Sequence, residues 1–284
     1  MFVVTDPPPI TRAPRDVEGW ARCFEAASLP VLGATAFALE QLRANEDAVD
    51  AHLLAETVAA DPLLTLKVLA HVAGLRRGRL DDTRGGPETV TAALVLMGIG
   101  PFFRAFGRQV TVDEMLGSDE EALEGFNRVL RRSHRAANFA LGFAVHRMDH
   151  DAPVIHEAAL LHDFAELLLW LRAPELAKAI AQRQAADPTL RSAAVQRELL
   201  NIELFDLQQA LMHAWRLPPL LVRISDDRHA DSDPVRNVML AIRVARHSAQ
   251  GWDNAALPDD VTEIAHLLQL GIDPVWRLLQ ELDA

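Results

Sequence analysis

The sequence predicts an all-α protein, and two observations carry this prediction. Alanine and leucine dominate the 284 residues, and apolar side chains recur at helical spacings without forming alternating runs. Prolines and glycines punctuate these apolar stretches, and no Gly/Ser linker divides the chain. We therefore expect one multi-helix domain, long enough to be built as two helical lobes.

The helices are expected to begin and end at cap and turn signals. Asp50 is suited to cap one helix, and Asp61 and Pro62 to begin the next as N-cap and first residue. Leu66, Leu69 and Val72 then fall on an inward helix face. The stretches expected to be helical are 18–27, 35–44, two between 50 and 75, two short ones within 88–110 that meet at Gly98 and Pro101, 119–147, 153–172, two between 174 and 200, 205–217, 235–249 and the region 261–284.

Two polar segments are expected to be loops. The glycine-rich stretch 76–87 and the charged stretch 225–234 show no apolar periodicity. Residues 1–15, which hold several prolines, are expected to form an irregular arm. The domain organisation that follows is an arm over 1–15, a helical domain over 16–260 and a helical extension over 261–284.

Composition limits the classes of function. A net charge of −12 argues against a nucleic-acid-binding surface over the whole molecule, although "RVLRRSHR" (128–135) is either a local anion site or a solvated helix face. The lone Cys23 suits a reducing compartment. The chain has no tyrosine, no signal-peptide pattern and no apolar run of membrane-spanning length. We expect a soluble, cytoplasmic protein.

The stretch "EAALLHDFAELLLWL" (157–171) places His162 and Asp163 inside an apolar run. A buried charged group is costly unless it is paired, hydrogen-bonded or bound to a metal. Imidazole and carboxylate would suit iron, zinc or manganese, with His134 as a further ligand from the preceding helix. Alternatively, His162 is a structural histidine bonded to Asp163 or Glu166. The residues alone leave both interpretations open, and no nucleophile elbow, phosphate-binding glycine loop or zinc-finger spacing is present.

Several segments, in order and at similar spacing, resemble the HDOD family, a helical branch of the HD metal-dependent phosphohydrolases found in bacterial signalling proteins. The resemblance covers about residues 28–250. The segments that carry it are "LPVLGATAFALEQL", "LLAETVAADPLLTLKVLAHVAG", "VTAALVLMGIGPFFRAF", "RRSHRAANFA", "EAALLHDFAELLLW" and "LQQALMHAWRLPPLLVRISDDRH".

The resemblance implies that His134, His162 and Asp163 occupy three metal-ligand places of the HD superfamily. The fourth place, an aspartate in the superfamily, aligns with Arg246, and arginine cannot ligate a metal. His247 is adjacent but is expected on another face. Other positions also depart from the family. Ala73-Gly74 stands where the family carries Asn-Ser, and Ala165-Glu166 where one subclass carries Gly-Lys. Leu204 stands in the place of a histidine, and Arg228-His229 in the place of paired histidines.

These departures predict a signalling or scaffolding protein that works through contacts with other signalling proteins, with His134, His162 and Asp163 as vestiges of a metal site. No cofactor, nucleic acid or membrane is then expected, and catalysis is not favoured. One alternative is a phosphohydrolase for a nucleotide or cyclic dinucleotide, with one iron, manganese or zinc ion. Another is a nucleotide sensor without catalysis, whose anion pocket would be formed by Arg228, His229 and Arg246.

Overall fold

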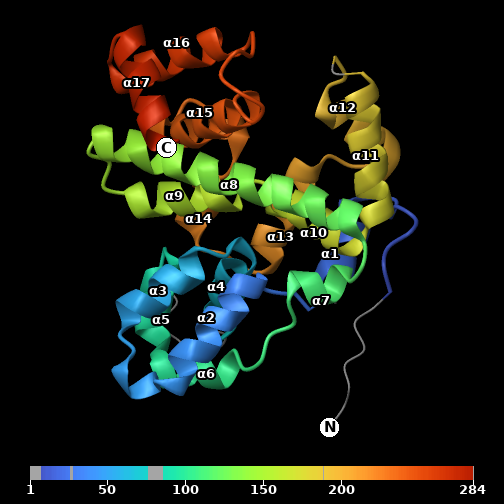
Figure 1. Cartoon of the computed structure of the whole chain (residues 1–284), viewed down its shortest axis with the longest axis vertical. Helices are drawn as coiled ribbons and strands as arrows, with labels where there is room; N and C mark the ends of the chain where they lie inside the picture. The colour runs from blue at the N-terminus through green and yellow to red at the C-terminus, as the bar shows by residue number, and fades with distance from the viewer. Residues whose placement is uncertain (1–7, 26–27, 76–85, 188, 284) are drawn as a thin grey trace. The chain divides into compact units, whose positions relative to one another are not determined.

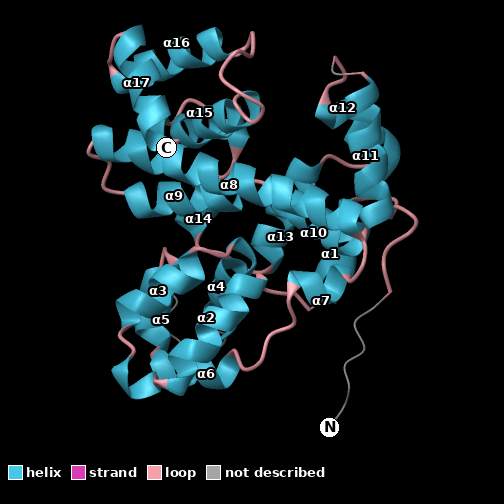
Figure 2. Cartoon of the chain, viewed as in Figure 1, coloured by secondary structure: helices cyan, strands magenta, loops and turns pink. Residues whose placement is uncertain are grey.

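The computed structural model describes residues 8–25, 28–75, 86–187 and 189–283, and it is helical throughout (Figures 1 and 2). Within these ranges there is no strand, and extended pairing is limited to one isolated bridge between Val31 and Thr111. The all-α prediction is confirmed. Over the same residues, no helix combines the length and apolar character needed to cross a membrane.

The elements in chain order are α1 (Val17–Glu25), α2 (Gly33–Ala44), η1 (Glu46–Ala48), α3 (Ala51–Ala59), α4 (Pro62–Leu75), α5 (Val90–Met97), α6 (Ile99–Ala105), α7 (Val112–Leu116), α8 (Glu120–His146), α9 (Ala152–Leu161), α10 (Phe164–Arg172), α11 (Pro174–Ala186), α12 (Ser192–Leu200), α13 (Leu204–Ala214), α14 (Pro219–Ile224), η2 (Asp227–His229), α15 (Asp233–His247), α16 (Leu257–Leu268) and α17 (Ile272–Leu282).

The chain forms two compact units, and both are discontinuous in sequence. Unit 1 comprises residues 1–128 and 163–217, and unit 2 comprises residues 129–162 and 218–284. The boundary therefore crosses α8 after Arg128 and falls again between His162 and Asp163. Two helical units agree with the two-lobe form of the sequence prediction.

Unit 1 is built around buried aromatic and leucine side chains. Helix α1 packs on α13, α10 packs on α11 and α13, and α3 contacts α2, α4 and α5. Trp20 is fully buried and donates its indole N–H to the carbonyl of Leu200, 2.9 Å away. The segment before α1 bonds to the end of α10, where the Ile10 amide donates to the Arg172 carbonyl at 2.6 Å.

The two predicted N-caps are confirmed. The Asp50 carboxylate accepts the Leu53 amide at 2.8 Å and begins α3. Asp61 is fully buried, and its Oδ1 accepts the Leu63 and Leu64 amides at 2.9 and 3.1 Å at the start of α4. The inward face predicted for α4 is also present, because Leu66, Leu69 and Val72 are all buried.

Several local expectations need correction. Helix α6 begins at Ile99, so Pro101 lies inside its first turn and does not begin it. Gly98, with φ of 81°, ends α5 as expected. Helices α7 and α14, and the short helix η2 in the expected loop 225–234, were not anticipated. Most of the expected loop 76–87 lies outside the described residues.

Unit 2 places α9, α14 and α16 around α15, and α17 packs on α16. Helix α9 has a long buried face, which includes Val154, Ile155 and Ala158. The second part of α8 packs closely on α17, because a Cβ atom added at Gly142 would overlap the side chain of Leu282. The glycine therefore permits the close approach of these two helices.

The expectation of one helix over 153–172 is wrong, and the error falls at the residues of most interest. Helix α9 ends at Leu161, with His162 as its C-cap, and α10 begins at Phe164, with Asp163 as its N-cap. The two helices bury their sides against different partners, since α9 packs on α14 and α15 whereas α10 packs on α11 and α13. The His-Asp dipeptide is therefore the junction of two helices.

Candidate functional site

His162 is held by a carboxylate that the sequence did not single out. Its imidazole Nε2 lies 3.2 Å from Oδ1 and 3.3 Å from Oδ2 of Asp227, the first residue of η2. The His162 residue is 8% exposed, whereas the Asp227 side chain is 34% exposed. Both residues belong to unit 2. The contact joins the end of α9 to η2, which is separated from it by 65 positions in the sequence.

Asp163 lies on the other side of the unit boundary and is buried. Its backbone carbonyl accepts the amides of Glu166 and Leu167, at 3.0 and 3.2 Å, and so begins α10. Its side chain forms no N-cap bond within that helix. Since the helix breaks here, the premise that His162 and Asp163 project from one continuous helix does not hold.

His134, the third predicted ligand, lies near a histidine that the sequence did not pair with it. It is half-buried on α8, and His156 on α9 is half-buried in the same unit. Burial lowers the pKa of His156 below its usual value of 6.5, and the nearby His134 ring lowers it further. Two imidazoles are thus brought together by α8 and α9.

These side chains do not complete a metal site. A bound transition metal requires three or more protein ligands in most catalytic and structural sites. His162 and Asp227 supply two donor groups, and within the described parts of the chain no group of three or more His, Cys, Asp or Glu side chains lies close enough to hold a metal ion. The described donor set does not fit a metal.

The predicted anion residues lie on η2 and α15, two elements that contact each other in unit 2. Arg228 is exposed on η2, and Arg246 is exposed in the last turn of α15. His229 is paired with Asp226, whose Oδ2 lies 3.0 Å from the imidazole Nδ1. Its side chain is 64% exposed, so this His–Asp pair is the solvent-facing counterpart of the pair formed by His162 and Asp227.

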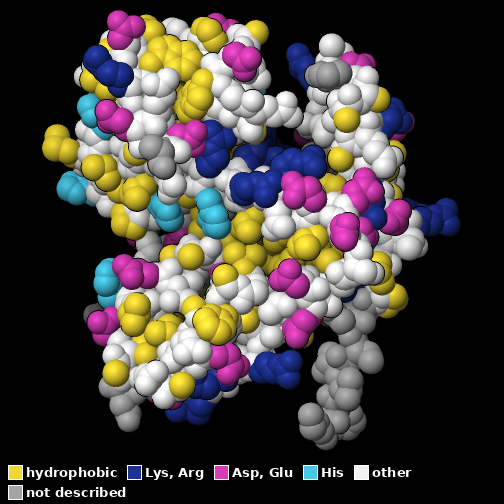
Figure 3. Space-filling view, in the orientation of Figure 1, with side chains coloured by type: hydrophobic (Ala, Val, Ile, Leu, Met, Phe, Trp, Pro, Cys, Tyr) yellow, Lys and Arg dark blue, Asp and Glu magenta, His cyan; other side chains and the backbone are white. Residues whose placement is uncertain are grey.

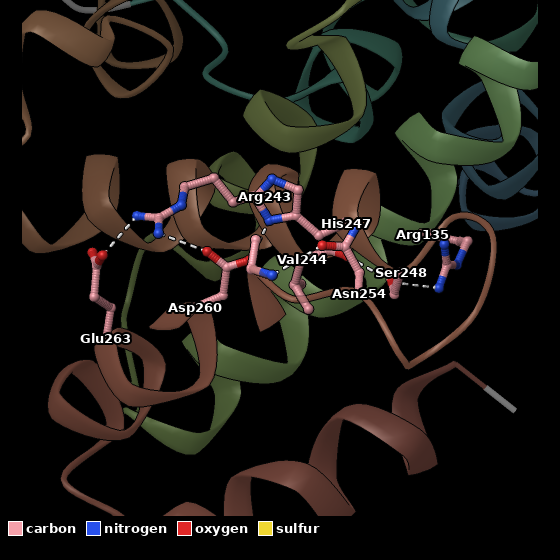
Figure 4. Close-up of polar contacts among 9 residues, drawn as sticks. Arg135, Arg243, Val244, His247, Ser248, Asn254, Asp260 and Glu263 are labelled. Atoms are coloured by element: carbon pink, nitrogen blue, oxygen red, sulfur yellow. Dashed lines mark hydrogen bonds and ion pairs between the residues drawn. The ribbon is translucent and has the colours of Figure 1, made fainter. Parts of the chain in front are cut away.

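His247, the neighbour of Arg246, is directed toward α16 (Figure 4). Its Nδ1 lies 2.5 Å from Oδ2 of the fully buried Asp260. Arg243 forms ion pairs with the other oxygen of Asp260, at 2.6 Å, and with Glu263, at 2.9 Å. His247 therefore takes part in the packing between α15 and α16. Because its Nδ1 contacts Asp260, this nitrogen is unsuited to replace the metal ligand that is lost at Arg246.

Basic side chains gather over the middle of α8 on the face shown in Figure 3. The sequence places "RVLRRSHR" at this point of the helix. Arg128 and Arg131 are exposed and Arg132 is half-exposed. The structure thus places these arginines at the surface.

Asp227 is the site residue that sequence reasoning missed. It lies in "SDDRH", whose composition predicts a charged loop. One feature of the sequence could have indicated it, namely the pair Asp226-Asp227 directly before Arg228 and His229. Nothing in the sequence indicates that Asp227 faces a histidine in α9 while Asp226 faces His229.

The family assignment follows from a comparison with family models, in which the HDOD domain matches residues 29–230. The chain belongs to the HDOD family. The resemblance drawn from the sequence segments is therefore confirmed. No curated protein sequence matches the chain.

Solved structures share the HDOD fold seen here. The MmoQ response regulator from Methylococcus capsulatus is 24% identical, with a TM-score of 0.65 over 89% of this chain and 98% of that one. A virulence factor from Campylobacter jejuni is 18% identical, with a TM-score of 0.63 over 89% of each chain. At these identities the comparison shows the fold of the HDOD chain alone.

Proposed function

We propose that this HDOD protein is a signal-transduction component that acts through contacts with other proteins and does not hydrolyse phosphoesters. The observation that carries the proposal is the contact of His162 with Asp227. The ring nitrogen that could ligate a metal faces a carboxylate at 3.2 to 3.3 Å, without a third ligand among the described residues. The family membership and the fold shared with the MmoQ response regulator support a role in signalling.

In this proposal His162 and Asp227 stabilise unit 2. Hydrogen bonds that involve a charged group contribute about 1.5–3 kcal/mol each when they are shielded from solvent. His162 is buried, so removal of its imidazole would also leave a cavity at the end of α9. The pair therefore connects the end of α9 to η2 by a polar contact.

The experiment combines metal analysis, catalysis and stability in three proteins: the unmodified chain, His162→Ala and His229→Ala. His229→Ala is a matched control, because His229 pairs with Asp226, the residue before Asp227, but is itself exposed. We expect metal far below one ion per chain in all three, and no turnover of nucleotide or cyclic dinucleotide phosphoesters with Mn²⁺ or Fe²⁺. His162→Ala should lower the free energy of unfolding by about 2–3 kcal/mol, and His229→Ala by less than about 0.5 kcal/mol. Near-stoichiometric metal, or metal-dependent turnover, that disappears in His162→Ala would overturn the proposal in favour of a phosphohydrolase.

A second candidate function is nucleotide binding without cleavage. It is favoured by the exposure of Arg228 and Arg246 on two contacting elements, because arginine binds phosphate well without a metal. A ligand that binds only the folded state raises the melting temperature. Thermal shift measurements with cyclic dinucleotides, on the unmodified chain and on Arg228→Gln and Arg246→Gln, test this. A shift that both substitutions abolish, while the exposed Arg128→Gln retains it, would support a sensor; no shift would remove this candidate.

A further inference from the structure

A pocket of about 400 Å³ lies within unit 1. Its walls are largely apolar and include Phe24 of α1, Leu66 of α4, Phe106 at the end of α6 and Trp215 at the end of α13. Lys67 and His71 of α4 also line it. A concave, mainly apolar pocket with few polar groups is the usual form of a small-molecule site.

Lys67 brings a positive charge to this pocket and hydrogen-bonds there to neutral groups. Its ammonium donates to the carbonyl of Leu29 at 2.7 Å and to Oε1 of Gln109, both neutral acceptors. An ammonium has three N–H donors, so one remains after these two bonds. Among the described residues no carboxylate lies within ion-pair distance of Lys67. A cation removed from water without an anion is unfavourable, and a bound anion would relieve this.

The neighbouring carboxylate of Asp61 is engaged elsewhere. It accepts the amides of Leu32 at 2.7 Å and of Leu63 and Leu64 at the start of α4. It acts on Lys67 only through its electrostatic field, which raises the pKa of that amine. The larger effect is burial, and the net result is a pKa lowered to about 8. At neutral pH the amine therefore remains mainly charged.

The other polar groups limit the charge of a suitable ligand. The exposed Glu25 also lines the pocket, and the chain carries a net charge of −12. Both disfavour a phosphate or another multiply charged anion. The His71 ring packs edge-on against Phe106, with centroids 5.3 Å apart, and so contributes to the aromatic wall. A ligand with a single negative charge on an apolar body therefore suits a pocket that combines one cation, one exposed carboxylate and aromatic walls.

We propose that this pocket binds a small amphipathic monocarboxylate. Its apolar body packs between Phe24, Phe106 and Trp215, and its carboxylate accepts the remaining N–H of Lys67. The inference does not depend on the proposed role in signalling, because every residue that carries it lies in unit 1.

Calorimetric titration of the full chain near pH 7 tests the proposal with four probes: phenylacetate, phenylacetamide, hexanoate and phenyl phosphate. We expect phenylacetate and hexanoate to bind, and phenylacetamide and phenyl phosphate to bind at least about tenfold more weakly, which matches the strength of one charge-assisted hydrogen bond. Lys67→Met should lose carboxylate binding, while Lys178→Met, at the other lysine of the chain, should retain it.

A second variant keeps the test decisive if Lys67→Met does not fold. Ala70→Leu would place added bulk in the pocket from α4 and leave both bonds of Lys67 in place, so it should abolish carboxylate binding. Equal binding of phenylacetate and phenylacetamide, preference for phenyl phosphate, absence of binding by any probe, or unchanged binding in either pocket variant would overturn the proposal.

Discussion

The guanidinium of Arg135 on α8 holds the carboxylate of Asp283 at two points, with Nε 2.6 Å from Oδ1 and Nη2 2.8 Å from Oδ2. The same guanidinium donates to the carbonyl of Ala245 at 3.2 Å, near the end of α15. It also donates to the hydroxyl of Ser248, which follows α15, at 2.8 Å (Figure 4). One side chain thus connects α8, α15 and the end of α17, and bidentate pairs of this kind are among the stronger polar contacts in proteins.

Replacement of Asp283 by alanine should therefore weaken the attachment of α17 to α8 and lower the stability of the chain. Both side chains of the pair are largely shielded, with 24% and 19% exposure. We expect Asp283→Ala to lower the free energy of unfolding by about 1.5–3 kcal/mol in urea titrations. The control is Glu18→Gln, which breaks the exposed pair with Arg22 and should cost less than about 0.5 kcal/mol. Equal effects of the two substitutions would contradict this prediction.

The stability of the chain should rise with pH above neutrality because of Lys67. Its pKa is lowered by burial to about 8, below the ordinary value of 10.5. Between these values the unfolded chain binds more protons than the folded chain, so the free energy of unfolding increases with pH, by about 3 kcal/mol in all. Below about pH 8 both states are protonated and this contribution is constant.

Few other groups obscure this measurement. The chain has no tyrosine, and Lys67 and Lys178 are its lysines. Hydrogen bonds to Asp119 and Glu175 raise the pKa of Lys178, so that this group titrates above the window. Urea titrations from pH 7 to pH 10.5 on the unmodified chain and on Lys67→Met are the direct comparison. A slope that persists in Lys67→Met would mean that another group produces it.

Asp61 should be among the most sensitive positions in unit 1. Its fully buried carboxylate accepts three backbone amides, from Leu32, Leu63 and Leu64. Asp61→Ala leaves these donors without an acceptor and should lower the free energy of unfolding by about 2–4 kcal/mol. Asp61→Asn keeps one acceptor oxygen and should cost less than half as much. If the two variants are equally stable, the amides do not depend on this side chain.

Gly125 should not tolerate a methyl group. A Cβ atom added there would overlap the ring of the buried Trp170, which packs against α8 within unit 1. Overpacking costs about 1–3 kcal/mol, which exceeds the gain in helix propensity of about 1 kcal/mol. Gly142→Ala is the comparison, because there the added atom meets the flexible end of Leu282 and should cost less. Calorimetric melting of both variants checks the order.

Local signals predicted much of the fold. The caps at Asp50 and Asp61 and the glycine turn at Gly98 depend on side-chain and backbone chemistry within a few residues, and the structure has all three. Helix α7 was missed although its capping box is formed by Thr111 and Glu114, a spacing that is visible in the sequence. Such features can be read without knowledge of distant contacts.

The candidate site could not be predicted in the same way. The break between α9 and α10 falls at a histidine and an aspartate. Neither residue is a proline or a glycine, so no local signal in the sequence marks the break. The break reflects burial of the two helices against different neighbours. The contact between His162 and Asp227 likewise depends on how α14 and η2 return to α9, which is a property of the folded chain.

The division of both units in sequence has a consequence for synthesis. Residues 129–162 leave the ribosome before the 55 residues of unit 1 that follow them, and α14, α15 and α16 come later still. At about 5–20 residues per second, α9 is synthesised several seconds before α14 and α15, which cover its apolar side in the folded chain. Unit 2 should therefore be the last part to become protease-resistant on a nascent chain. A message truncated before α15 would yield a product that cellular quality control removes, whatever the state of its first unit.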